Sequence, residues 1–264
     1  MLCKYNVFSL DKRTYAIEEK TPFSQGLCYL LCGDDAALLI DTGMPFGNIK
    51  KTVQKRTALP ITAVNTHAHV DHIGSNHRFD EIAYHEDDRG VFALHTSQEY
   101  IGGALVQYAL PPGQARLLAP FAKRLMVPKA AGNYRYIQDG HVFRLGGRDI
   151  EAVHTPGHTP GCICLLDREA RLLFTGDTLC EWGALLDLQG SLSAEIYLAS
   201  IQKLKALSPA YDKILPGHHG WPVDKSYLDD YEACAAGIIN GSAYVEQAGS
   251  RRHAKHGKVI ISIP

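Results

Sequence analysis

One short segment constrains this chain more than any other. Thr66-His-Ala-His-Val-Asp-His-Ile-Gly74 places four side chains of the metal-ligand type within six residues, directly after an apolar run that predicts a buried strand. Alternate residues of an extended segment share a face, so His67 and His69 can point the same way. Asp71 and His72 then lie in the turn and can reach a second point. Imidazole nitrogens and carboxylate oxygens suit zinc, with iron and manganese as alternatives.

Three later segments share one form, a strand followed by a turn that carries a ligand-type side chain. His158 lies between two Pro-Gly pairs, Asp177 follows Thr-Gly, and His218 follows Pro-Gly. An earlier acidic turn, Asp41-Thr-Gly43, also ends an apolar run. Loops at strand ends are held by a rigid scaffold and are where functional sites are built. The position directly after Pro-Gly favours His218 over its neighbour His219 as a ligand.

The rest of the chain is predicted to consist of short strands and a few helices. Strands are expected at 6–10, 14–17, 27–32, 36–40, 61–65, 81–85, 141–145, 150–154, 162–166, 171–174, 213–215 and 258–263. Helices are expected at 46–59, 194–207 and 226–245. This order fits two sheets with helices outside better than a doubly wound parallel sheet. Residues 86–137 are interpreted as a helical insertion that covers the site within a single domain, 1–264.

Composition excludes several classes of protein. The 264 residues carry 27 Lys and Arg against 28 Asp and Glu, a formal charge of -1, which gives no electrostatic case for nucleic acid. No apolar run approaches the length of a membrane-spanning helix, and the first residues lack a signal peptide. Seven cysteines without a CxxC pair favour a reducing cytoplasm. The basic cluster at 251–258 is interpreted as a solvated turn before the last strand.

The motifs HxHxDH, PGHTPG, TGD and PGH, in this order, resemble the metallo-β-lactamase superfamily. The resemblance runs from about residue 27 to residue 220 and is to the glyoxalase II-like, thioesterase-like branch. It implies an α/β fold, the αββα four-layer sandwich, with two divalent metal ions, zinc first among them, at one edge of the sheets. The implied ligands are His67, His69 and His158 for the first metal, Asp71, His72 and His218 for the second, and Asp177 with a hydroxide for both.

This arrangement implies a hydrolytic mechanism. Two dications roughly 3.5–4 Å apart lower the pKa of a shared water to near 7, and the resulting hydroxide attacks a carbonyl carbon. Asp71 orients the nucleophile or takes its proton. Asp41 and His219 are expected to support the ligands from behind, as hydrogen-bond acceptor and pocket residue.

The substrate is harder to predict. An apolar wall beside the metals is expected from Trp182, Leu185, Leu186 and Tyr197, and it suits an acyl group. The stretch after Asp177 lacks the Gly-rich, Arg-bearing pattern of glyoxalase II-like enzymes, which argues against glutathione thioesters. The prediction is hydrolysis of a small acyl thioester, ester or lactone, with neither nucleic acid nor membrane as partner. A homodimer is the common default.

Two other interpretations stay open at this point. One is a mononuclear non-haem iron dioxygenase that acts on sulfur or persulfide groups, which metal analysis distinguishes from a zinc hydrolase. The other is a binding protein with a vestigial site, for which Asp71→Ala would be without effect.

Overall fold

The computed structural model describes residues 4–20, 25–45, 47–97, 100 and 133–264. The chain forms two compact units: Met1–Ile137 with Arg144–Arg148, and Gln138–Phe143 with Asp149–Pro264. Within the insertion expected at 86–137, residues 98–99 and 101–132 lie outside the described residues. The expectation that it covers the site therefore stays a prediction.

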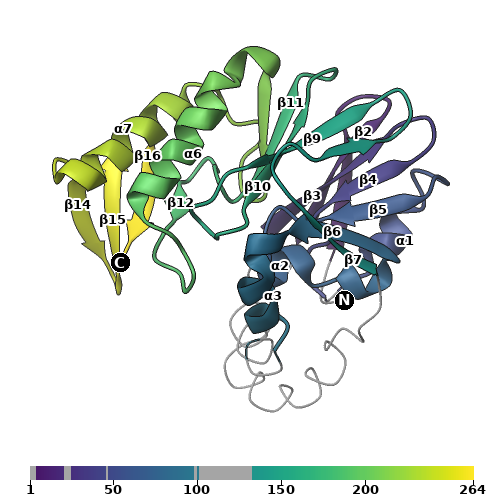
Figure 1. Cartoon of the computed structure of the whole chain (residues 1–264), viewed down its shortest axis with the longest axis horizontal. Helices are drawn as coiled ribbons and strands as arrows, with labels where there is room; N and C mark the ends of the chain where they lie inside the picture. The colour runs from purple at the N-terminus through teal and green to yellow at the C-terminus, as the bar shows by residue number, and fades with distance from the viewer. Residues whose placement is uncertain (1–3, 21–24, 46, 98–99, 101–132) are drawn as a thin grey trace. The chain divides into compact units, whose positions relative to one another are not determined.

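The first unit is built on a seven-stranded sheet, labelled in Figure 1. Its strands, in spatial order, are β1 (Lys4–Ser9), β2 (Thr14–Lys20), β3 (Gln25–Cys32), β4 (Ala37–Ile40), β5 (Ile61–Val64), β6 (Glu81–His85) and β7 (Asn133–Ile137). The first four pair antiparallel, and β4 to β7 pair parallel. Its described helices are α1 (Ile49–Val53), α2 (Val70–Ile73), η1 (Asn76–Arg78), η2 (Glu86–Asp88) and α3 (Arg89–His95).

The parallel part of this sheet sets the position of the histidine cluster. Strands β4 and β5 are almost wholly apolar because parallel strands are covered on both faces. Leu39 and Ala63 are fully buried and belong to one core cluster with Ile49 and Val53 of α1. Since β4 and β5 run in the same direction, the residues that follow them emerge at the same sheet edge.

The second unit contains two sheets and two long helices. The five-stranded sheet has the order β13 (Lys213–Pro216), β11 (Leu172–Gly176), β10 (Ile163–Asp167), β9 (Asp149–His154) and β8 (Val142–Arg144). The four-stranded sheet has the order β12 (Ala184–Leu185), β16 (Val259–Ile263), β15 (Arg251–His256) and β14 (Tyr244–Ala248). The helical elements are α6 (Ala194–Ala206), η3 (Ser208–Ala210) and α7 (Tyr227–Asn240).

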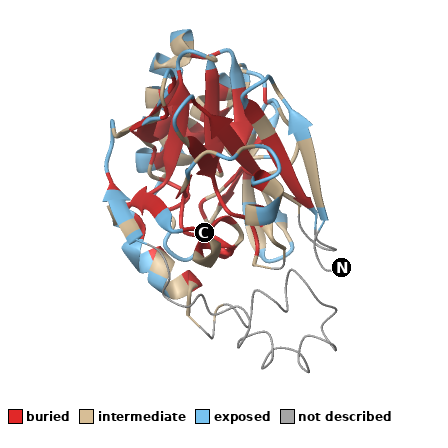
Figure 2. Ribbon diagram, turned by 90° about the vertical axis from the view of Figure 1, so that its right-hand side faces the viewer, coloured by how far each residue is buried: buried red, intermediate tan, exposed pale blue. Residues whose placement is uncertain are grey.

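The strand directions of the five-stranded sheet bring three turns to one edge. Strand β11 pairs parallel with β13, and β9 and β11 both pair antiparallel with the intervening β10. Strands β9, β11 and β13 therefore share a direction, and His158, Asp177 and His218 all follow their carboxyl ends. Behind them, Tyr197 and Ile201 of α6 pack in a core cluster with strand residues of both sheets. Figure 2 shows that the buried residues are concentrated in the strands.

Most predicted strands are found, and the differences have local causes. The helix expected at 46–59 is shorter and comprises only α1. It starts at Ile49 because the Asn48 side chain accepts a hydrogen bond from the Lys51 backbone N–H and so caps the helix, and it ends at Val53. The helix expected at 226–245 ends at Asn240, because Gly241 adopts φ 75° and ends α7.

The C-terminal region differs most from expectation. Residues 244–248 form strand β14 rather than helix. Of the basic cluster at 251–258, residues 251–256 form strand β15 and only Lys258 lies in a turn. Likewise, 133–137 of the expected helical insertion form strand β7. Strand β7 pairs with β6, β15 pairs with β16, and β14 pairs with β15, and sequence periodicity does not report such non-local pairing.

None of the described helices has both the length and the apolar character that a membrane-spanning helix needs.

Candidate metal centre

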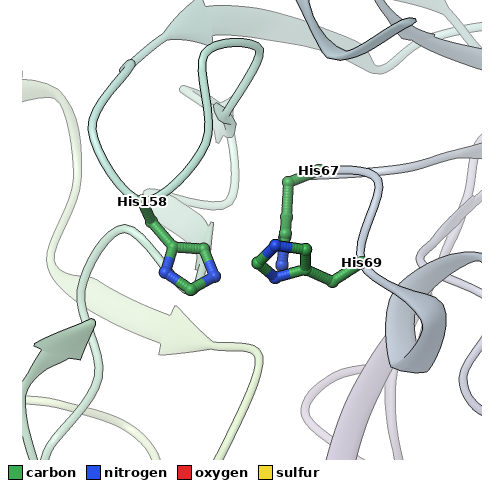
Figure 3. Close-up of side chains that lie close together, drawn as sticks. All are labelled: His67, His69 and His158. Carbon is green, nitrogen blue, oxygen red and sulfur yellow. The ribbon is translucent and has the colours of Figure 1, made fainter. Parts of the chain in front are cut away.

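The His67–His72 loop begins where β5 ends and is fixed by buried hydrogen bonds. Asp41 accepts hydrogen bonds from the backbone N–H and the hydroxyl of Thr66, both at 2.8 Å. Asp88, fully buried at the end of η2, accepts one from the Ala68 backbone N–H at 2.7 Å. These two carboxylates hold the residues on either side of His67. Figure 3 shows the His67 and His69 side chains projecting from this loop.

The three histidines of this loop are buried together. The ring centroids of His67 lie 4.6 Å from His69 and 4.0 Å from His72, and none of the three exceeds 6% exposure. Asp71 is more open, with 27% of its side chain exposed, and its Oδ2 lies 3.9 Å from Nε2 of His72. The loop thus gathers three imidazoles and one accessible carboxylate in the first unit.

Asp41 contacts His72 directly and His67 through the hydroxyl of Thr66. Its Oδ2 accepts from Nδ1 of His72 at 2.8 Å, which leaves Nε2 of His72 facing Asp71. The Thr66 hydroxyl that donates to the same oxygen also lies 3.2 Å from Nδ1 of His67. Because that hydroxyl proton is directed to Asp41, its oxygen can accept from His67. A carboxylate behind a histidine in this way fixes the ring and raises the basicity of the other nitrogen.

Asp41 is itself held in a rare backbone conformation. Its φ is 60°, a region that non-glycine residues seldom occupy, although Asp and Asn are enriched there. This places the carboxylate of the acidic turn after β4 beneath the loop after β5.

The second unit contributes His158, Asp177 and His218, which we call the Asp177 cluster. Nε2 of His158 lies 3.6 Å from Oδ2 of Asp177, and Nε2 of His218 lies 3.6 Å from Oδ1. The two oxygens of one carboxylate therefore face two different imidazoles. Figure 3 shows His158 on its own loop.

His158 is oriented by backbone. Its Nδ1 lies 2.8 Å from the carbonyl oxygen of Leu185, which can only accept, so Nδ1 carries the proton and Nε2 presents a lone pair. The His158 loop is braced by His154, whose Nε2 bonds the carbonyl of Pro160 at 2.8 Å. Leu185 was expected to line the pocket with its side chain. The structure shows that its backbone carbonyl orients the ring of His158, a ligand-type side chain.

His219 differs from His218 in its surroundings. Its ring stacks on Trp182, with centroids 4.3 Å apart and an angle of 3° between the planes. Burial is the main cause that lowers the pKa of His219. Trp182 is 66% exposed, so the indole offers a large apolar surface directly beside the Asp177 cluster.

Two residues expected in the pocket wall lie in the core instead. Tyr197 is fully buried and its hydroxyl donates to the Thr178 carbonyl at 2.8 Å, while Leu186 is 3% exposed. Both belong to the main core cluster of the second unit. Helix α6 places Tyr197 inward because its apolar stripe faces the sheets.

Sequence reasoning missed two residues that support the His67–His72 loop. His95 stacks on His69, with centroids 4.5 Å apart, and its Nδ1 accepts from the Val70 backbone N–H at 3.0 Å. Asp88 is the other. Both come from the η2 and α3 region, which no motif links to the histidines, so only the fold could reveal them.

The donor spacing within each unit fits shared cations better than hydrogen bonds. The His–Asp separations of 3.6, 3.6 and 3.9 Å exceed the usual hydrogen-bond range of about 2.7–3.2 Å. Ligand atoms about 2.1 Å from a tetrahedral zinc ion lie about 3.4 Å from one another. Imidazole and carboxylate are also the donor set that zinc prefers.

Comparison with known proteins identifies the class to which such a chain belongs. The family model described as "Metallo-beta-lactamase superfamily" matches residues 21–218, which include both groups of ligand-type residues. The chain therefore belongs to the metallo-β-lactamase superfamily. The predicted family, fold class and assignment to the metal-dependent hydrolases of this superfamily are confirmed.

Individual relatives agree with this assignment. The chain is 30% identical over 204 residues to "Acyl-coenzyme A thioesterase MBLAC2" of Gallus gallus, covering 72% of this chain and 71% of that protein. It is 27% identical over 213 residues to "Probable polyketide biosynthesis zinc-dependent hydrolase BaeB" of Bacillus velezensis, covering 78% and 79%.

A solved structure supports the fold. The metallo-beta-lactamase family protein TTHA1429 of Thermus thermophilus superposes with a TM-score of 0.65 at 20% identity, covering 88% of this chain and 82% of that one. At this identity the likeness concerns the fold alone.

Proposed function

We propose that this chain is a binuclear metal-dependent hydrolase of acyl thioesters. One observation carries the proposal: the two oxygens of Asp177 each face a different imidazole at 3.6 Å, the arrangement of a carboxylate shared by two cations. The family match supports the step from two clusters to one centre, because it runs through the His67–His72 loop and the Asp177 cluster alike. On the same ground we propose that the two units form a single catalytic domain.

We assign metal ligands among the histidines and aspartates of the two clusters, several of which are buried and held by hydrogen bonds. We propose His67, His69 and His158 for one ion, Asp71, His72 and His218 for the other, and Asp177 for both. Zinc is the metal we favour, because the donors are nitrogen and oxygen and the relative BaeB is named zinc-dependent. When bound, two such ions supply Lewis acidity and a water of lowered pKa.

The chain's own residues supply orientation and proton transfer. Asp41 holds His72, and through Thr66 it holds His67, in the tautomer that leaves Nε2 able to bind. The Leu185 carbonyl does the same for His158. Asp71 is the ligand-type carboxylate of its loop that solvent reaches, so its oxygen is the one we propose to take the proton during hydrolysis.

The exposed indole of Trp182 supports an acyl substrate. It is held flat by the ring of His219 and adjoins the Asp177 cluster, so it offers a preformed apolar surface beside the reacting group. The relative MBLAC2 is named an acyl-coenzyme A thioesterase, which supports a thioester over an ester or a lactone.

The experiment is an activity panel on the metal-loaded enzyme. Short- and long-chain acyl-coenzyme A, a lactone and S-lactoylglutathione are offered to the wild type, to Asp71→Asn and to Asp80→Asn, whose carboxylate is 99% exposed in the first unit. We expect acyl-coenzyme A turnover that falls at least about 100-fold in Asp71→Asn and is unchanged in Asp80→Asn. Absence of thioester hydrolysis, or a single iron with oxygen consumption, would overturn the proposal.

A further inference from the structure

The His158 loop, residues 154–161, depends on donors from elsewhere in the chain for its backbone hydrogen bonds. Its two prolines, Pro156 and Pro160, have no backbone N–H, so carbonyls outnumber N–H groups in the loop. All of its residues are buried or half-buried, and a buried carbonyl needs a hydrogen-bond donor. Several of these donors come from one later segment, residues 191–203, within the same compact unit.

The turn before α6 holds His158 directly. The Ser191 hydroxyl donates to the carbonyl of His158 at 2.9 Å. The Leu192 backbone N–H donates to the carbonyl of the preceding residue, Gly157, at 2.7 Å. On the ring side, Nδ1 of His158 is held by the Leu185 carbonyl at 2.8 Å. Because the backbone and the ring are both held, the direction in which Nε2 points is fixed.

Helix α6 holds the residues before His158. Tyr197, Ser200 and Lys203 are each three positions apart, so they adjoin one another on the helix surface, and we call them the α6 stripe. The Ser200 hydroxyl donates to the Pro156 carbonyl at 2.7 Å. Nζ of Lys203 donates to the His154 carbonyl at 3.0 Å. The turn and the helix thus bond four carbonyls of a single loop.

The α6 stripe also reaches the turn that carries Asp177. The ring of Tyr197 packs so closely on Gly157 that a Cβ at this glycine would lie 2.6 Å from Cδ2 of the ring, so the loop can approach the helix only with glycine there. The hydroxyl of the same side chain donates to the carbonyl of Thr178, the residue after Asp177, at 2.8 Å. One fully buried tyrosine therefore contacts both ligand turns.

We propose that segment 191–203 positions His158 against Asp177, with Ser191, Tyr197 and Ser200 as positioning residues of the metal centre. This inference rests on the proposed function, because it takes both turns to bind a shared ion. The separation to be held is the 3.6 Å between Nε2 of His158 and Oδ2 of Asp177. Groups that orient a metal ligand typically contribute about 10–100-fold to metal affinity. The Ser191 hydroxyl acts most directly, because it bonds the ligand residue itself.

The test measures how tightly each zinc ion is bound in Ser191→Ala. This variant removes one hydroxyl from a half-buried side chain outside the core. We expect the ion proposed to bind His158 to be held about tenfold more weakly and the other ion to be held as in the wild type. Competition with a chelator measures both affinities. The visible spectrum of the cobalt-loaded protein reports the coordination of the ions, which a loss of stability alone would not change.

Two matched variants accompany Ser191→Ala. Ser191→Thr keeps the hydroxyl and should restore the wild-type zinc affinity and cobalt spectrum. Ser193→Ala removes the hydroxyl of a neighbouring exposed serine that bonds Glu195 at the start of α6. Since this second hydroxyl supports the helix rather than the His158 loop, its removal should leave both zinc affinities unchanged.

Tyr197→Phe tests the contact with the Asp177 turn. It removes the hydroxyl that bonds the Thr178 carbonyl and leaves the ring on Gly157. Because Asp177 is proposed to bind both ions, we expect both zinc affinities to fall in this variant, whereas Ser191→Ala lowers one. Unchanged affinities in Tyr197→Phe would remove this tyrosine from the positioning residues.

The possible results separate this inference from the proposed function. Wild-type affinities in Ser191→Ala, an equal loss in Ser191→Ala and Ser193→Ala, or no recovery in Ser191→Thr would overturn the positioning role alone. Two zinc ions without thioester hydrolysis in the wild type would overturn the proposed substrate, while a loss confined to Ser191→Ala would still support the positioning role. A wild-type chain that binds no zinc would overturn both.

Discussion

At the scale of single residues, Asp41 makes hydrogen bonds that orient more than one of the ligand-type histidines. One buried carboxylate accepts from His72 and from Thr66, and through Thr66 it reaches His67. The sequence pattern indicates an acidic turn after an apolar strand and a supporting role for it. Which side chains it supports depends on the parallel pairing of β4 with β5, a non-local contact.

The Asp41 interaction gives the first prediction. Asn keeps the backbone conformation at φ 60°, since Asn is tolerated there, but its amide cannot accept on both sides. We expect Asp41→Asn to weaken zinc affinity about 10–100-fold with little change in unfolding temperature. Competition with a chelator measures the affinity, and the exposed Asp80→Asn is the control. Unchanged zinc affinity would show that Asp41 does not orient the ligands.

The two adjacent histidines at 218 and 219 give the second prediction. Nε2 of His218 lies at ligand spacing from Asp177, while the ring of His219 stacks on Trp182. We expect His218→Asn to lose about one metal ion per chain and His219→Asn to lose none. Asn suits the second position because His219 has φ 64°. Metal analysis of both variants decides; the reverse pattern would exchange their roles.

At the scale of elements, strands and turns were predictable where the pattern is local. Apolar runs mark β3, β4, β10 and β11, and Pro-Gly or Thr-Gly marks the turns that follow β9, β11 and β13. The hairpin β14–β15 was not predicted, because its residues are polar and its strands are stabilised by pairing with β16. The local signal in this region was Asn240-Gly241, a helix-stop pattern.

That helix stop gives the third prediction. Gly241 has φ 75° and no atom within 4 Å of a Cβ placed there, so an alanine meets only backbone strain. We expect Gly241→Ala to lower the free energy of unfolding by about 1–2 kcal/mol. Gly90, exposed in α3 and equally uncrowded, is the matched site, where alanine should stabilise by about 0.5–1 kcal/mol. Denaturant titration that finds the same sign for both variants would refute this account of α7.

At the scale of the whole molecule, the order of the motifs was enough to predict the superfamily, because four separated turns corroborate one another. The substrate was not predictable in this way. Substrate binding depends on side chains that the fold brings together from separate segments, and such segments carry no motif.

The pH dependence of activity is a property of the complete centre. Histidine binds metal only when unprotonated, and the ordinary pKa of an imidazole is about 6.5. Protons therefore compete with metal as the pH falls, and we expect activity and bound zinc to decline together below about pH 6. Parallel measurement of turnover and metal content from about pH 8 to about pH 5 checks this. Activity that stays constant over that whole range would contradict it.

The most direct test of the central claim is the metal content of purified chains that differ at Asp177. We expect about two zinc ions per wild-type chain and at most about one in Asp177→Asn, because one carboxylate is proposed to bind both ions. A wild-type chain without transition metal, or an Asp177→Asn chain that retains two ions and full thioester turnover, would contradict it.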